Sequence, residues 1–262
     1  MYPFYTVFGV QLPTYGLMTL FGIIAGAIVV MLRNRRAKLP GIDVLFTALF
    51  GLIGVGVGGK ILYWITILPI IIRNISLFTD PDFFNTVIVP GSVFYGGLIG
   101  SIIFAYLYIK KNKMDATVCG DLFAPAIPMF HAFGRLGCLF VGCCHGIPFE
   151  NGIVFHNAIG GAPSDIPLFP TQPIETGYNL LVFAALLIIG HFAKKKGNLV
   201  WYYMLMYAPF RFVIEFFRGD VVRGHLWIFS TSQWVSVLLV GFAVCMLAKS
   251  SRKHKNEHLT HA

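Results

Sequence analysis

Long apolar stretches, separated by short polar segments, are the feature of this 262-residue chain that most constrains its fold. Several of them exceed the roughly 10 to 14 residues of a buried core helix and approach the roughly 20 residues that cross a bilayer. The composition agrees, because 56% of the residues are hydrophobic and only 12% are charged, about half the charge of a soluble domain. The sequence therefore predicts an all-α integral membrane protein without a separate soluble domain.

Basic residues mark the ends of these stretches. Fourteen of the 20 lysines and arginines fall in four clusters, at 33–38, 110–113, 194–196 and 249–255. Cationic loops are retained on the cytoplasmic side of a membrane, so the clusters predict an outer N-terminus and a cytoplasmic C-terminus. The net charge of +9 is thus interpreted as a topology signal, and no nucleic-acid partner is expected.

We expect one polytopic membrane domain over residues 1–262, ending in a basic cytoplasmic tail at 248–262. Pro125 and Pro128 interrupt the fourth span, which predicts a kinked or broken helix there. The stretch 135–170 is rich in Gly, Pro, Cys and His and is predicted to lie outside the membrane. The seven predicted spans are 15–32, 44–68, 91–109, 118–133, 173–192, 199–217 and 231–247.

Ionisable residues inside the spans are few and are candidates for function, because placing a charge in a bilayer costs at least about 2.5 kcal/mol. Arg211 and Glu215 are four residues apart and share a helix face. Cations exceed acids near the outer side, so an anionic ligand is expected, and the planar fork of arginine suits a lipid phosphate. The candidates are Lys60, Asp121, Arg135, Glu175, Arg211, Glu215 and Arg218.

Six short motifs follow one another in the order found in bacterial prolipoprotein diacylglyceryl transferases, a family that the chain resembles over about residues 13 to 247. They are YGLM at 15–18, GGKILY at 58–63, FYGGLIG at 94–100, GRLGC at 134–138, PTQPIE at 170–175 and YAPFRFVIEFFR at 207–218. The six motifs together are far more specific than any one of them.

The resemblance implies a seven-span enzyme of the bacterial plasma (inner) membrane, with its active site toward the outer leaflet. Such an enzyme moves the diacylglyceryl group of phosphatidylglycerol to the thiol of the lipobox cysteine in a preprolipoprotein signal peptide. The products are a thioether and glycerol phosphate. No cofactor and no metal are expected.

The motif positions also imply the site residues. Arg135 and Arg211 match the family's two key arginines, and two guanidinium groups can stabilise the charge that develops on a departing phosphate. The catalytic candidates are Arg135, Arg211, Tyr207, Tyr95 and Glu215. The candidates for binding phosphatidylglycerol are Arg135, Arg211, Tyr15, Gly96, Gly97, Gly146, Glu175 and Lys60.

Some positions differ from the residues usual in the family. Tyr95 stands where His is common, and a phenol with a pKa near 10 is a poor base at neutral pH. Cys138 stands in place of Asn, and Cys143 in place of a frequent Glu. Two alternatives therefore stay open: a diverged, non-catalytic phospholipid-binding or transport protein, and a related lipid transferase with a different acceptor.

Three cysteines and a histidine, Cys138, Cys143, Cys144 and His145, lie within eight residues. A disulfide, a metal site, small buried thiols and a functional thiol with His145 as its base are all open interpretations. The consecutive placement of 143–145 matches no common zinc spacing.

Overall fold

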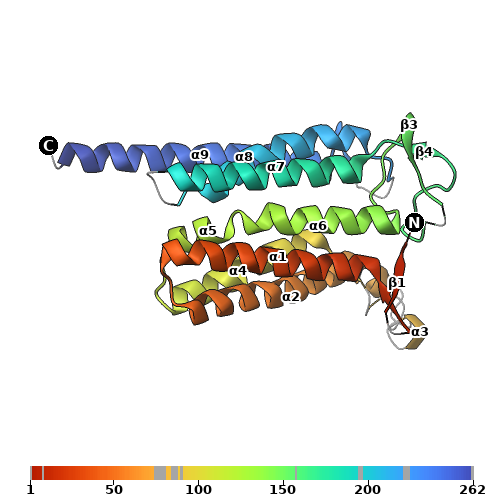
Figure 1. Cartoon of the computed structure of the whole chain (residues 1–262), viewed down its shortest axis with the longest axis horizontal. Coiled ribbons are helices and arrows are strands. Elements are labelled where there is room, and N and C mark those ends of the chain that lie inside the picture. Colours follow the sequence, from red (N-terminus) through yellow and green to blue (C-terminus); the bar gives the residue numbers. More distant parts are fainter. Residues whose placement is uncertain are drawn as a thin grey trace. The chain divides into compact units, whose positions relative to one another are not determined.

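The computed structural model describes residues 2–7, 9–73, 81–83, 88, 91–156, 158–193, 197–220 and 225–260. The predicted basic cluster at 194–196 lies outside these residues. Helices dominate the fold (Figure 1). They are α1 (Thr14–Ala37), α2 (Gly41–Arg73), α3 (Pro81–Phe83), α4 (Phe94–Lys111), α5 (Ala116–Phe123), α6 (Ala126–Val141), α7 (Thr171–Phe192), α8 (Leu199–Ile214), the 3-10 turn η3 (Glu215–Phe217) and α9 (Thr231–Thr260).

Three antiparallel two-stranded ribbons occupy connections between the helices. β1 (Phe4–Val7) pairs with β2 (Val10–Pro13), with Phe4 opposite Pro13. β3 (Pro148–Val154) pairs with β4 (Pro167–Leu168), and β5 (His225–Leu226) pairs with β6 (Phe229–Ser230). None of these ribbons extends into a larger sheet within the described residues.

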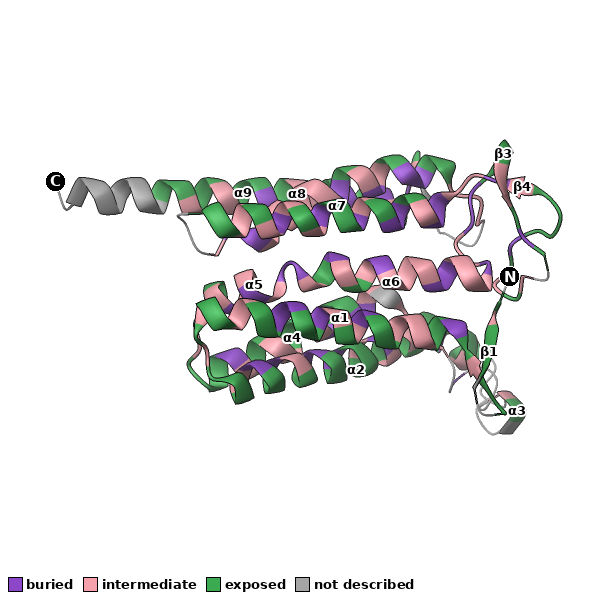
Figure 2. Ribbon diagram, in the orientation of Figure 1, coloured by how far each residue is buried: buried purple, intermediate pink, exposed green. Residues whose placement is uncertain are grey.

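Five helical segments of the described chain are long and apolar enough to cross a membrane, which confirms the prediction of a multi-pass helical membrane protein. Their apolar side chains point outward, as lipid contact requires, and Leu181 and Leu238 are each 69% exposed. Figure 2 shows such exposed residues along α1, α2, α7 and α9. α4 and α8 cover the two remaining predicted spans. The five segments are Thr14–Ala37, Gly41–Arg73, Ala116–Val141, Thr171–Phe192 and Thr231–Arg252.

The fourth predicted span is broken, as its prolines indicate. α5 ends at Phe123 and α6 begins at Ala126. The predicted end of this span at residue 133 is wrong, however, because α6 continues to Val141 and packs against α1 and α7. Gly142, with φ of 75°, ends the helix by donating its N–H to Cys138 O. Arg135 therefore lies on the helix and not in a loop after it.

The chain forms two compact units, Met1–Ala37 with Gly120–Ala262, and Lys38–Cys119. In the first unit, α1 packs on α6, α6 on α7, α7 on α8, and α8 on α9. In the second unit, α2 packs along α4. A Cβ added at Gly54 would collide with Gly100 O, and one added at Gly58 with Gly96 O. Glycine thus lets these two backbones touch, as expected of small residues in membrane helices.

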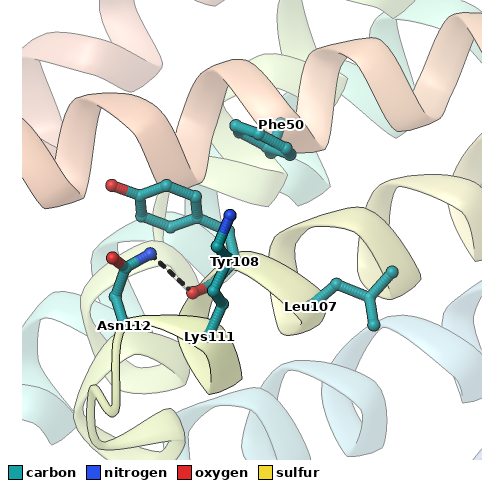
Figure 3. Close-up of a pocket in the computed structure, with 5 residues that line it drawn as sticks. All are labelled: Phe50, Leu107, Tyr108, Lys111 and Asn112. Atoms are coloured by element: carbon teal, nitrogen blue, oxygen red, sulfur yellow. Dashed lines mark hydrogen bonds between the residues drawn. The ribbon is translucent and has the colours of Figure 1, made fainter.

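A small depression of about 190 Å³ lies on the second unit, lined by Phe50, Leu107, Tyr108, Lys111 and Asn112 (Figure 3). Tyr108 Oη donates to Asp43 Oδ1 at 3.1 Å, and Asn112 Nδ2 donates to Tyr108 O at 3.0 Å. Its lining contains none of the predicted site residues. We therefore build the candidate site from the buried charges of the first unit.

Candidate active site

Glu175 is the most deeply buried charge of the first unit. It lies in the second turn of α7, and its side chain is 0% exposed. Its Oε2 is 2.7 Å from Arg135 Nε on α6, and its Oε1 is 2.9 Å from Arg218 Nη1. A carboxylate this deep requires positive partners, and here two arginines from different segments supply them.

Arg218 contacts two carboxylates, those of Glu175 and Asp220. Its side chain is 2% exposed, and its Nε and Nη2 each lie 2.9 Å from an oxygen of Asp220. Such a two-pronged contact fixes the plane of the guanidinium group. Arg218 follows η3, whose chain pairs with the loop after α6: Ile147 N donates to Phe217 O, and Gly219 N donates to His145 O, both at 3.0 Å.

Gly146 and Gly219 lie at close contacts of the loop after α6. Gly146 forms an isolated β-bridge with Arg218. A Cβ at Gly219 would collide with Gly146 O, and a Cβ at Gly146 would collide with Phe169 O. The structure thus gives Gly146 a packing role beside Phe169. Its predicted contact with lipid stays a prediction.

Arg135 joins three elements. Besides Glu175, its Nε lies 3.3 Å from His131 Nε2, to which it donates, and its guanidinium group lies within electrostatic range of Tyr207 of α8. The rings of His131 and Tyr207 are 5.1 Å apart. Sequence reasoning missed His131 as a partner, although its spacing of four residues from Arg135 on one helix was an available signal.

Arg211 and Glu215 form the second buried ion pair, as their spacing predicts. Arg211 Nη2 lies 2.6 Å from Glu215 Oε2 and donates to Ser232 Oγ at 3.2 Å. Ser230 Oγ donates to Glu215 Oε1 at 2.9 Å. Arg211 Nη1 is buried and has no hydrogen-bond partner among the described residues. Buried donors are nearly always paired in folded proteins, so this nitrogen is a candidate contact for an anionic ligand.

The two arginine–carboxylate pairs, Arg135–Glu175 and Arg211–Glu215, belong to one region of the first unit. Tyr207 and His131 each lie within electrostatic range of both Arg135 and Arg211. Tyr15, in the first turn of α1, packs against Gly137, where a Cβ would lie 3.0 Å from its ring. Tyr15 also lies within electrostatic range of Arg135. The structure therefore brings together Tyr15, Arg135, Glu175, Tyr207, Arg211 and Glu215 from the predicted set.

Four other predicted residues belong to the second unit. They are Lys60, Tyr95, Gly96 and Gly97, and Lys60 Nζ donates to Gly91 O at 2.8 Å. Gly96 lies in the tight contact of α4 with α2 described above. Their roles as lipid-binding or catalytic residues stay predictions.

Asp121, the remaining charge predicted within a span, stabilises a helix end. Its carboxylate accepts hydrogen bonds from the backbone N–H of Gly197 and, at 2.8 Å, from that of Leu199. These are free donors at the start of α8, which an acidic side chain satisfies well. Arg33 Nη2 also donates to Asp121 O at 3.0 Å. Asp121 thus has a structural explanation outside the arginine region.

The three cysteines after Arg135 converge. Cys138 lies in the last turn of α6, and Gly142 and Cys144, with φ of 75° and 58°, turn the chain back toward it. All three thiols are free, and their Sγ atoms lie within 4.8 Å of one another. Hydrogen bonds from Cys138 and Cys143, together with the charges of Arg135 and Arg218, lower the pKa of Cys144 below its ordinary value.

His145 is not part of this group. Its Nδ1 lies 3.0 Å from the backbone oxygen of Gly146. The loop that contains Cys143 and Cys144 is held in place by hydrogen bonds from the start of α7. Gln172 Nε2 donates to Cys143 O at 2.8 Å, and Thr171 Oγ1 donates to Cys144 O at 3.0 Å.

Apolar helices with outward-facing side chains, together with buried arginine–carboxylate contacts, define a class: a multi-pass membrane protein with a buried cluster of arginines and carboxylates. Comparison with known proteins specifies the family. The family model for prolipoprotein diacylglyceryl transferase matches residues 3–249, and the chain belongs to this family.

Relatives agree with this assignment over nearly their whole length. A protein of Clostridium tetani named phosphatidylglycerol–prolipoprotein diacylglyceryl transferase is 34% identical over 238 residues, which cover 90% of this chain and 92% of the relative. In Clostridium perfringens, a protein with the same name followed by the number 2 is 35% identical, with 89% of each chain covered. A relative from Chlorobaculum tepidum is 30% identical, covering 96% of this chain and 90% of its own.

Proposed function

We propose that this protein transfers the diacylglyceryl group of phosphatidylglycerol to the lipobox cysteine of a preprolipoprotein. The observation that carries the proposal is the buried Nη1 of Arg211, which has no hydrogen-bond partner among the described residues. The relatives' names state the same substrates. The alternation of basic clusters supports seven spans in the bacterial plasma membrane, with the N-terminus outside, the C-terminus cytoplasmic and the site toward the outer leaflet.

In the proposed reaction, the acceptor sulfur attacks the glycerol carbon that carries the phosphate. The S–C bond forms as the C–O bond to phosphate breaks, and glycerol phosphate leaves with the electron pair. Charge therefore concentrates on the phosphate oxygens in the transition state. Arg211 and Arg135 stabilise that charge, and their positions cost no reorganisation because neighbouring groups already hold them.

The carboxylates act as positioning residues. Glu175 and Asp220 balance Arg135 and Arg218, and Glu215 balances Arg211. Without a ligand, the cluster is therefore close to neutral and tolerates burial. A bound phosphate meets donors whose directions are already set, which is the arrangement that favours catalysis by preorganised charge.

Complementation tests the proposal. A strain whose own transferase is under conditional control receives this chain, the Arg135→Ala variant or the Arg211→Ala variant, with membrane expression checked in each. We expect growth and lipoprotein maturation with the wild-type chain only. Absence of rescue by a well-expressed wild-type chain contradicts the proposal. Binding of phosphatidylglycerol without transfer would then favour the non-catalytic lipid-binding alternative.

A further inference from the structure

The three converging thiols lie close enough together to bind one metal ion. Zinc–sulfur bonds of about 2.3 Å place the sulfurs of one zinc ion about 3.8 to 4.0 Å apart, and the three Sγ atoms here lie within 4.8 Å of one another. A disulfide would use only two of them and leave the third unexplained. Soft thiolate ligands select cations such as zinc.

The surrounding structure holds the thiols in place. Cys138 is on a helix, and the backbone oxygens of Cys143 and Cys144 are bound by Gln172 and Thr171. Gly160 packs directly against Cys143, since a Cβ there would lie 2.7 Å from the Cys143 backbone N. A non-glycine residue with positive φ, such as Cys144, is a strained feature that persists where the surroundings enforce it.

We propose that Cys138, Cys143 and Cys144 bind a zinc-class cation whose fourth coordination position takes the acceptor thiol. This inference rests on the proposed function. Three protein ligands with one open position are the usual arrangement of catalytic zinc. Cys138 follows Arg135 by three residues, so both lie on one side of α6, and Tyr15 lies within electrostatic range of both.

Such a cation would explain how the acceptor thiol loses its proton before it attacks the lipid. Three possible bases among the described residues are engaged: Glu175 and Glu215 pair with arginines, and His131 Nε2 accepts a hydrogen bond from Arg135. A thiol that coordinates the cation is deprotonated, and its proton passes to solvent. The bound sulfur keeps a lone pair that forms the S–C bond as phosphate leaves. The product is a neutral thioether, a weaker ligand than the thiolate, so it dissociates.

Cobalt spectroscopy tests the proposal on the full-length protein in detergent. The chain is reduced, freed of metal with a chelator and titrated with Co²⁺, which reports thiolate ligands by charge-transfer bands and tetrahedral geometry by d–d bands. A short peptide with a single cysteine is then added, and the same peptide with serine serves as its control. The protein variants are Cys138→Ser, Cys143→Ser and Cys144→Ser, with Cys245→Ser as the matched control in α9.

We expect thiolate bands that saturate at one cobalt per chain in the wild type and in Cys245→Ser, and their loss in the three cluster variants. The cysteine peptide should change the d–d bands, and the serine peptide should not. Size-exclusion elution shows whether each variant is folded, and Cys138→Ala provides a second substitution if Cys138→Ser aggregates.

Several outcomes overturn the proposal: no thiolate bands in the wild type, bands that persist when all three cysteines are replaced, or no response to the cysteine peptide. A disulfide within the cluster of protein purified without reductant, found by mass spectrometry, also overturns it. The titration needs no lipid. A chain that rescues growth but binds no cobalt therefore refutes this inference and leaves the proposed function standing.

Discussion

At the scale of single residues, two of the buried arginines in the first unit differ in how their guanidinium groups are bound. Arg218 is engaged by Glu175 and Asp220. Arg211 is also largely buried but keeps Nη1 without a partner in the described part of the chain. The second arrangement is the one expected of a residue that awaits an anionic ligand.

Replacing Arg211 by Lys should therefore reduce transferase activity by about 100-fold, the cost of losing one preorganised donor. A lysine retains the charge but has no planar fork, so it cannot bind Glu215 and phosphate together. The measurement is transfer of labelled diacylglyceryl to a lipobox peptide by purified protein. Arg35→Lys, at an exposed position of α1, is the control, and equal rates in both variants would refute the role of Arg211.

Glu175→Gln should destabilise the fold by about 3 kcal/mol or more, because removing one partner of a buried pair leaves the other charge uncompensated. Here two arginines lose their shared carboxylate. Thermal unfolding in detergent checks this. Glu150→Gln changes an exposed carboxylate and should leave the midpoint unchanged. Matching midpoints for both variants would show that Glu175 is not required to hold the arginines.

At the scale of elements, close backbone contacts in both units require glycine at particular positions. α2 and α4 approach so closely at Gly58 and Gly96 that their backbones touch. In the first unit, a Cβ at Gly219, the residue after Arg218, would collide with Gly146 O in the loop after α6. Both contacts depend on glycine at one position of the sequence.

Gly58→Ala should cost about 1 to 3 kcal/mol, the usual penalty of overpacking a tight contact, because its Cβ would collide with backbone and not with a movable side chain. Gly56 lies two residues away on the same helix, and nothing lies within 4 Å of a Cβ added there. Gly56→Ala should therefore be neutral or slightly stabilising. Unfolding in detergent compares the pair, and a neutral Gly58→Ala would contradict the tight packing.

At the scale of the whole molecule, the proposed orientation in the membrane rests on the basic clusters. α1 ends in Arg35 and Arg36, and α4 ends in Lys110 and Lys111. α9 continues as a helix to Thr260, so the described part of the predicted basic tail, 248–260, is helical.

Reporter fusions test this orientation. Alkaline phosphatase folds into an active enzyme only outside the plasma membrane, whereas green fluorescent protein fused to a cytoplasmic end fluoresces. A C-terminal fusion should give fluorescence and no phosphatase activity, because the basic tail stays on the cytoplasmic side. A fusion after Gly219 should show the reverse. Phosphatase activity at the C-terminus would overturn the predicted topology.

The sequence by itself determined what depends on neighbours along the chain. Long apolar stretches specify membrane helices, prolines specify the break between α5 and α6, and a spacing of four residues specifies the Arg211–Glu215 pair. The motifs indicated the family, which the comparisons confirm. Only the tertiary structure decided which distant groups meet. It placed Glu175 between Arg135 and Arg218, which lie 40 and 43 residues from it in sequence.

The tertiary structure also assigned Asp121 to a helix end and brought three thiols together that no zinc spacing predicts. The physical reason is the same in each case. Hydropathy and helix periodicity are properties of neighbouring residues in the sequence. Ion pairs between distant residues and clusters of thiols depend instead on the direction that the chain takes after turns such as 142–144. A sequence pattern does not specify that direction.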